Sequence, residues 1–176
     1  MNIIDFFRVA QKRLHAGLRR SVQDLTVDEW HYRTGGTGNS IAFIFWHCVR
    51  TEDGIMRFIL QGRPPIWNEG KWSERFTLPS RVQGTGMPME EAQTIRIDDP
   101  ALFLQYAEQV WQEFEEYLAG ITDGGAELSE RMVMVKPIGN IPAIMAIGQI
   151  CITHLFTHQG EIAALLGAQG KHGMAF

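Results

Sequence analysis

The chain has 176 residues, of which 45% are hydrophobic and 20% are charged. This composition is typical of a globular protein and excludes a disordered chain, and the length suits one domain over residues 1–176. The formal net charge of −4 offers no basic surface of the kind that binds nucleic acid.

The cysteines and the N-terminal segment indicate a cytoplasmic protein. Cys48 and Cys151 both lie in apolar runs, which argues against a disulfide framework and fits a reducing compartment. The segment "MNIIDFFRVAQKR" contains Asp5 and Arg8, too early for a signal peptide. No uninterrupted apolar run is long enough to span a membrane. We therefore expect neither a membrane nor a nucleic acid as partner.

The first predicted helix covers residues 3–22. Residues at helical spacing predict its buried face, and His15 is expected on the surface; the apolar positions are Ile3, Phe6, Phe7, Ala10, Leu14, Gly17 and Leu18. The glycine-rich segment "RTGGTGN" (33–39) then interrupts any helix.

The second predicted helix covers residues 39–61, with Asn39 or Ser40 as its N-cap. Its first half is apolar almost all round, which predicts burial on most sides. Residues 63–97 show no helical or strand period but contain Trp67 and Trp72. Because the tryptophans favour packing, we expect a long ordered loop against the helices.

The third predicted helix, residues 99–119, begins with Asp99 as N-cap and Pro100 as its first residue. A loop follows, with one extended piece at "RMVMV" (131–135). The fourth helix covers residues 141–166, and Gly160 within it suggests a close approach of another backbone. Four helices of about 20 residues are about 30 Å long, which predicts an all-α four-helix bundle with a long ordered loop between the second and third helices.

A histidine constellation is the strongest chemical signal. His154 and His158 are four residues apart in an apolar segment, so they project to one side of the same helix. His47 is the only other histidine inside an apolar helical stretch. Three imidazoles with an open fourth position suit Zn²⁺, Ni²⁺, Fe²⁺ or Co²⁺. The alternative is that each is a structural histidine with its own buried hydrogen-bond partner.

Four stretches of sequence carry a resemblance to a known family: "WHCVRTED" (46–53), "QGRPPIWNEGKWSERFTLP" (61–79), "GTGM" (84–87) and "HLFTHQGEI" (154–162). They resemble the DinB/YfiT-like superfamily of metalloenzymes, in the branch with a tryptophan-containing loop after the second helix. The resemblance covers nearly the whole chain. It implies an up-down-down-up four-helix bundle, a metal held by His47, His154 and His158, and a homodimer. Some relatives use low-molecular-weight thiols.

Three further residues are candidates for the site. Glu161 shares the face of His154 and His158, so it either orients an imidazole, binds the metal or is a solvated carboxylate. Arg50 either binds an anionic substrate group at the mouth of the site or forms a structural salt bridge. Cys151, three residues before His154, either faces the metal or is a core thiol.

These features predict a divalent-metal-dependent enzyme that acts on a small molecule, of the hydrolase or thiol (S-)transferase type. The ion would act as a Lewis acid or would activate a bound water or thiol. The sequence shows no second general base near the histidines, which favours a substrate with its own nucleophile, such as a low-molecular-weight thiol. The alternative is a non-catalytic, metal-binding dimeric module for binding or stress response, which a closed coordination sphere would favour.

Overall fold

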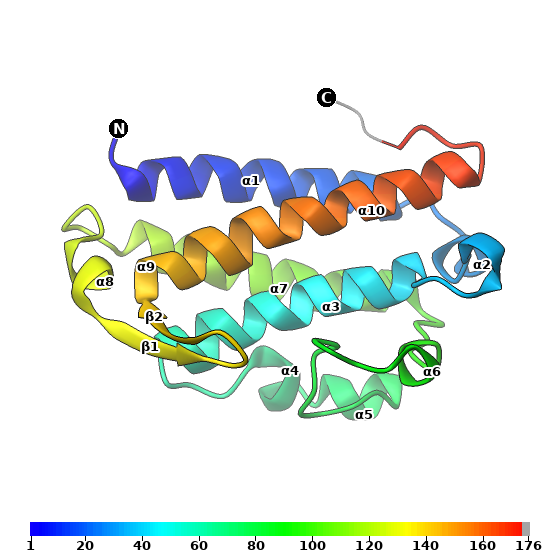
Figure 1. Ribbon diagram of the computed structural model, residues 1–176, viewed down its shortest axis with the longest axis horizontal. Helices are drawn as coiled ribbons and strands as arrows, with labels where there is room; N and C mark the ends of the chain where they lie inside the picture. Colours follow the sequence, from blue (N-terminus) through cyan, green and yellow to red (C-terminus); the bar gives the residue numbers. More distant parts are fainter. Residues whose placement is uncertain (174–176) are drawn as a thin grey trace.

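The computed structural model describes residues 1–173 and is mostly helical (Figure 1). Its long helices begin and end close to the predicted positions. They are α1 (Ile3–Val22), α3 (Ile41–Asp53) continued by the π-helical segment η2 (Gly54–Leu60), α7 (Pro100–Ala119), and α9 (Ala143–Met145) continued by η3 (Ala146–His154) and α10 (Leu155–Ala168).

Local capping interactions explain where these helices begin. The side chain of Asn2 accepts a hydrogen bond from the backbone N–H of Asp5 at the start of α1. Ser40, one of the two predicted caps, accepts from the N–H of Phe43 at the start of α3. Asp99 caps α7 as predicted, with Pro100 as the first helical residue. Each cap satisfies a backbone donor that has no partner within its helix.

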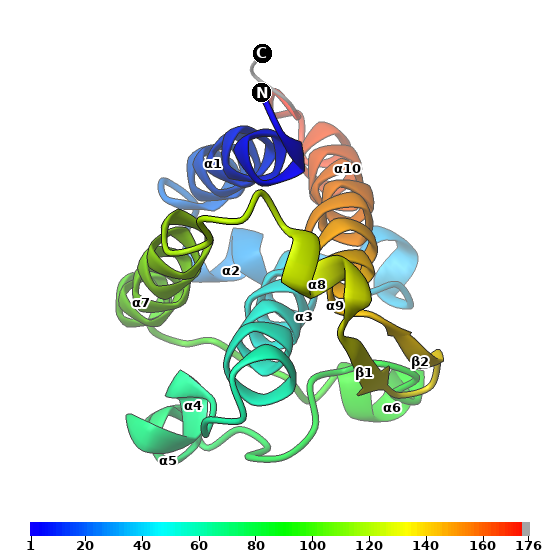
Figure 2. The same ribbon diagram turned by 90° about the vertical axis from the view of Figure 1, so that its left-hand side faces the viewer.

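The long helices pack side by side, with α3 in the interior. Helix α1 contacts α7 and α10, and α3 contacts the same two helices from the other side (Figure 2). The colours of Figure 1 show that α1 and α10 run in one direction and that α3 and α7 run in the other. Every residue of α3 is buried, as its apolar sequence predicted. The arrangement therefore places residues of α3 opposite residues of α10 within the core.

The segment between η2 and α7 is ordered and packs against the long helices. It contains the short helices α4 (Ile66–Glu69), α5 (Trp72–Phe76) and α6 (Met89–Ala92). Both tryptophans of the segment, Trp67 and Trp72, are buried, as expected. The carboxylate of Asp53 in α3 accepts hydrogen bonds from the backbone N–H groups of Ile66 and Trp67, which fixes the start of the segment.

A β-hairpin precedes the last long helix. Strands β1 (Met132–Val135) and β2 (Gly139–Pro142) are antiparallel, and the short helix α8 (Ala126–Glu130) leads into them. The extended piece predicted at 131–135 is thus confirmed, although it belongs to a small two-stranded sheet that the all-α prediction did not include. Strand β1 packs against η2, so the tip of the hairpin lies beside the second long helix.

Two short helices connect α1 to α3. They are α2 (Val27–Trp30) and the 3₁₀ turn η1 (Thr34–Gly36). Within residues 1–173, none of the helices is both long enough and apolar enough to cross a membrane.

Two sequence expectations about helix faces are wrong. Helix α1 buries Phe7, Leu14, Gly17 and Leu18 as expected, but it is rotated slightly from the expected stripe, so Gln11 is buried while Ile3 and Phe6 are exposed. Gly160 in α10 is open, because a Cβ built there would meet no atom within 4 Å. The close approach of α1 to α10 occurs at Gly17 instead, where a Cβ would overlap the side-chain amide of Gln159.

The rotation of α1 brings His15 into a buried polar cluster rather than onto the surface. Its Nε2 lies 2.8 Å from Oε1 of Glu52, which is fully buried. Its ring stacks on that of Trp111, with centroids 4.8 Å apart. Burial raises the pKa of the Glu52 carboxyl, and the His15 ring opposes that rise. The pair therefore links α1 to α3 on the side of α3 that faces α7.

Candidate metal centre

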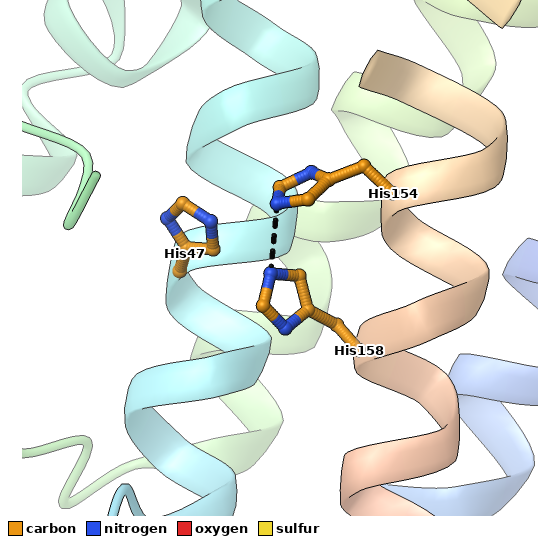
Figure 3. Close-up of side chains that lie close together, drawn as sticks. All are labelled: His47, His154 and His158. Carbon is orange, nitrogen blue, oxygen red and sulfur yellow. Dashed lines mark hydrogen bonds between the residues drawn. The ribbon is translucent and has the colours of Figure 1, made fainter. Parts of the chain in front are cut away.

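The structure brings the three predicted histidines together. His47 projects from α3 toward His154, the last residue of η3, and His158 in α10 (Figure 3). Each offers one ring nitrogen, and the three nitrogens lie within 4.8 Å of one another. The helical spacing of His154 and His158 places both on the face of the last helix that meets α3. Among residues 1–173, no other group of three histidine, cysteine or carboxylate side chains converges in this way.

A hydrogen bond outside the cluster orients His47. Its Nδ1 lies 2.5 Å from the carbonyl oxygen of Gln83. Only a protonated Nδ1 can donate to that oxygen, so Nε2 of the neutral ring carries the lone pair. The ring also stacks on Phe43, with centroids 6.2 Å apart and an interplanar angle of 6°. His47 therefore presents an unprotonated nitrogen to the cluster.

Glu161 orients His158 in the same manner. Its Oε2 lies 2.8 Å from Nδ1 of His158, which assigns the proton to Nδ1 and leaves the lone pair on Nε2. That Nε2 lies 2.9 Å from Nε2 of His154 (Figure 3). His154 donates this hydrogen bond, since its partner nitrogen has no proton to give. Of the three roles considered for Glu161, the structure shows the orienting contact.

Burial keeps His47 and His154 in the neutral form that binds metal ions. Burial lowers the pKa of His47 to about 4, and the neighbouring rings of His158 and His154 act in the same direction. Burial also lowers the pKa of His154, with a further contribution from His158. An imidazole must lose its proton before it can bind a metal. At neutral pH His47 is therefore ready to bind, and His154 is neutral but has to move its proton from Nε2 to Nδ1 to bind an ion through Nε2.

Gly84 is a residue of the site that the sequence did not identify as such. It follows Gln83 and has φ of +95°, and a Cβ at this position would lie 3.1 Å from Nδ1 of His47. A side chain here would strain the backbone and displace the imidazole. The Gly in "GTGM" is the only sequence signal for this contact, and the contact joins segments 36 or more residues apart.

A pocket opens beside His154. It has a volume of about 190 Å³ and is lined by polar and apolar side chains from four regions of the chain. Thr51, one turn after His47, and Gln149, in the turn before His154, contribute polar groups. Lys136 at the hairpin tip is its charged residue. A small molecule in this pocket would thus contact His154.

The other two candidates lie away from the cluster. Arg50 is buried against Trp67, with its guanidinium carbon 4.9 Å from the ring centroid, and its Nη2 donates to the carbonyl oxygen of Ser80. Cys151 is buried in the apolar core, where burial raises the pKa of its thiol well above the ordinary value. A protonated core thiol is not a metal ligand. Neither residue joins the three histidines.

The donor set fits a divalent transition metal. Nitrogens bound at about 2.0–2.1 Å to one ion are at most about 4.2 Å apart, and the His154–His158 nitrogen pair already meets this limit. Hydrogen bonds from the outer nitrogens of His47 and His158 to an oxygen are the usual support of metal-binding imidazoles. The cluster is therefore compatible with a bound metal.

Comparisons with known proteins agree with this picture. No curated protein matches the chain. A solved structure, "Crystal structure of the conserved protein of locus from Enterococcus faecalis", is similar with a TM-score of 0.82 and 20% sequence identity, over 97% of this chain and 99% of that one; at this identity it shows the fold alone. The family model described as DinB superfamily matches residues 10–162. The chain belongs to the DinB superfamily.

Proposed function

We propose that this protein is a metal-dependent enzyme whose ion is held by His47, His154 and His158. The observation that carries the proposal is the convergence of three imidazoles in which two outer nitrogens are already bonded to oxygen. Three neutral nitrogen donors suit Zn²⁺, Ni²⁺ or Fe²⁺. The pocket beside His154 supports an open coordination position.

We infer that the long helices form an up-down-down-up four-helix bundle and that residues 1–176 are one domain. The helix directions in Figure 1 support this inference. We also propose a cytoplasmic homodimer, on the family resemblance and on buried, free cysteines. Sedimentation that shows only a monomer at micromolar concentration would contradict the dimer.

The residues around the proposed ion site have separate roles in orienting the histidines and the substrate. A bound ion supplies Lewis-acid chemistry or lowers the pKa of a water or thiol. Gln83 and Glu161 hold the tautomers of His47 and His158. Gln149 lines the pocket, where its amide can orient a substrate.

The pocket favours thiol transfer over hydrolysis. Among the described residues that line it, His154 and Lys136 are the titratable ones, and no carboxylate is placed there to activate a water. A substrate that brings its own nucleophile, such as a low-molecular-weight thiol, needs no such base, since an ion can hold it as the thiolate.

The rival function is a non-catalytic, metal-binding module with a closed coordination sphere. Cobalt substitution separates the two. If the Co²⁺-loaded protein has an open position, addition of 2-mercaptoethanol should produce a thiolate-to-cobalt charge-transfer band in the near ultraviolet. A spectrum that does not change with added thiol would favour the closed, non-catalytic module. Cys48 and Cys151 are buried and should not contribute to the band.

A further inference from the structure

The pocket beside His154 continues across the second long helix as a groove. Two neighbouring pockets of about 500 Å³ and about 420 Å³ share lining residues with it, and Gln83 lines all three. The groove crosses the helix from the face of Thr51 and Ile55 to the face of Arg50, Gly54 and Phe58. The hairpin tip forms one wall and the segment Ser80–Gln83 forms the other.

The charged side chains of the groove are all cationic. Lys136 lies at the end beside His154, and Arg81 and Arg50 lie at the far end. Within the described part of the chain, no aspartate or glutamate lines any of the three pockets, although the protein as a whole has a net charge of −4. Lys136 and Arg81 are exposed and form no ion pair with residues 1–173. A groove of this charge attracts anions.

Arg50 provides a buried donor that the protein does not satisfy. The residue is 3% exposed, and among residues 1–173 neither its Nε nor its Nη1 has a hydrogen-bond partner. Asp53 is 3.7 Å away, but its carboxylate already accepts from Ile66, Trp67 and Tyr106. A buried guanidinium N–H without an acceptor is costly, and a carboxylate or phosphate oxygen is the acceptor it fits best.

The wall that carries Arg81 is fixed to α3 at both ends. Arg50 donates to the carbonyl oxygen of Ser80 at 3.3 Å, and His47 donates to that of Gln83. The backbone of Arg81 is thereby held beside the groove. Between the two charged ends, Ile55, Phe58 and Met134 provide an apolar lining.

We propose that this groove binds an elongated small molecule with an acidic group at each end and an apolar middle. One acidic group would lie at Lys136, beside His154, and the other at Arg81 and Arg50. Binding of the ligand does not depend on the proposed function, because the far anion site contains no metal-binding residue. Only the role of the ligand as a substrate rests on the proposed function.

Calorimetric titration of the metal-free protein tests the groove without the ion. The probe is octanedioate, a linear diacid with an apolar middle, compared with octanoate and with 1,8-octanediol at low salt. We expect octanedioate to bind more tightly than octanoate, and the diol to bind most weakly. Arg81→Gln should weaken octanedioate binding about three- to tenfold and octanoate binding less, since octanoate can still place its one carboxylate at Lys136. Arg20→Gln, the same charge change on an exposed residue at the end of α1, should change neither.

The methyl resonances of the methionines locate the probe. Met134 lines the groove and should shift with octanedioate, whereas Met132, exposed on the same strand, should not.

Equal affinity for octanedioate and octanoate would overturn the proposal, as would equal effects of the two arginine substitutions. Absence of binding at about 10 mM probe, the weak limit of specific recognition, would do the same. Elemental analysis of the same preparation after metal loading reports on the proposed function separately. If the protein binds octanedioate but no metal, the proposed groove stands and the proposed metal-dependent enzyme does not. If it binds metal but no octanedioate, the enzyme proposal stands and the groove does not.

Discussion

Replacement of Glu161 tests whether the outer hydrogen bond on His158 supports metal binding. The Oε2–Nδ1 contact is 2.8 Å, and the Glu161 side chain is 48% exposed. Loss of such a partner typically weakens metal affinity about 10–100-fold. Because water can replace a half-exposed carboxylate, we expect the lower end for Glu161→Ala, about tenfold or about 1.4 kcal/mol. Glu161→Gln keeps a hydrogen-bond acceptor without the charge, so its metal affinity should fall less, by about threefold.

Competition titration of Zn²⁺ against a chromophoric chelator measures these affinities. Glu130→Gln removes a carboxylate from an exposed residue at the end of α8 and serves as the matched control, which should bind like the wild type. The order wild type, Gln, Ala in decreasing affinity is the expected result. If Glu161→Ala bound Zn²⁺ as tightly as the control, Glu161 would have no role in orienting His158.

Three further predictions follow from other residues. Gly84→Ala should lower the free energy of unfolding by about 1–2 kcal/mol, because the residue has a positive φ. The new Cβ should also displace His47 and weaken Zn²⁺ binding. Normal Zn²⁺ affinity in this variant would contradict the contact between Gly84 and His47. Gly160→Ala should stabilise the protein by about 0.5–1 kcal/mol in urea unfolding, and destabilisation would show that α10 is covered there. The raised pKa of Glu52 means that the wild type loses stability as pH rises above 4.5 through the folded-state pKa. Glu52→Gln lacks this loss, so metal-free Glu52→Gln should gain stability relative to the wild type over that window, whereas parallel pH profiles would contradict the raised pKa.

The long helices and the histidine cluster could be predicted from the sequence for related reasons. Local signals such as Ser40 and the Asp99–Pro100 pair fix where helices begin, and these signals depend on few residues. Burial of α3 and of one face of the last helix then places their histidines in the space between the two helices. The four-residue spacing of His154 and His158 then places both side chains on the same face of their helix.

Contacts between distant segments could not be predicted in this way. The apolar residues near the start of α1 permit two faces, and packing against α7 and α10 selects the one that buries Gln11. Arg50 follows His47 by three residues but turns toward the loop at Ser80, whereas Thr51, the next residue, lines the pocket. Gly84 matters only because the loop returns to His47, which no local pattern encodes.

Elemental analysis of the purified protein tests the central claim most directly. After exposure to Zn²⁺ or Ni²⁺ and removal of free metal, the wild type should retain about one ion per chain, and His47→Ala, His154→Ala and His158→Ala should each retain almost none, since two imidazoles rarely hold such an ion at micromolar concentration. Circular dichroism of each variant would verify that the helices remain folded. A wild type without metal, or a folded His47→Ala that retains as much metal as the wild type, would show that the three histidines do not form a metal site.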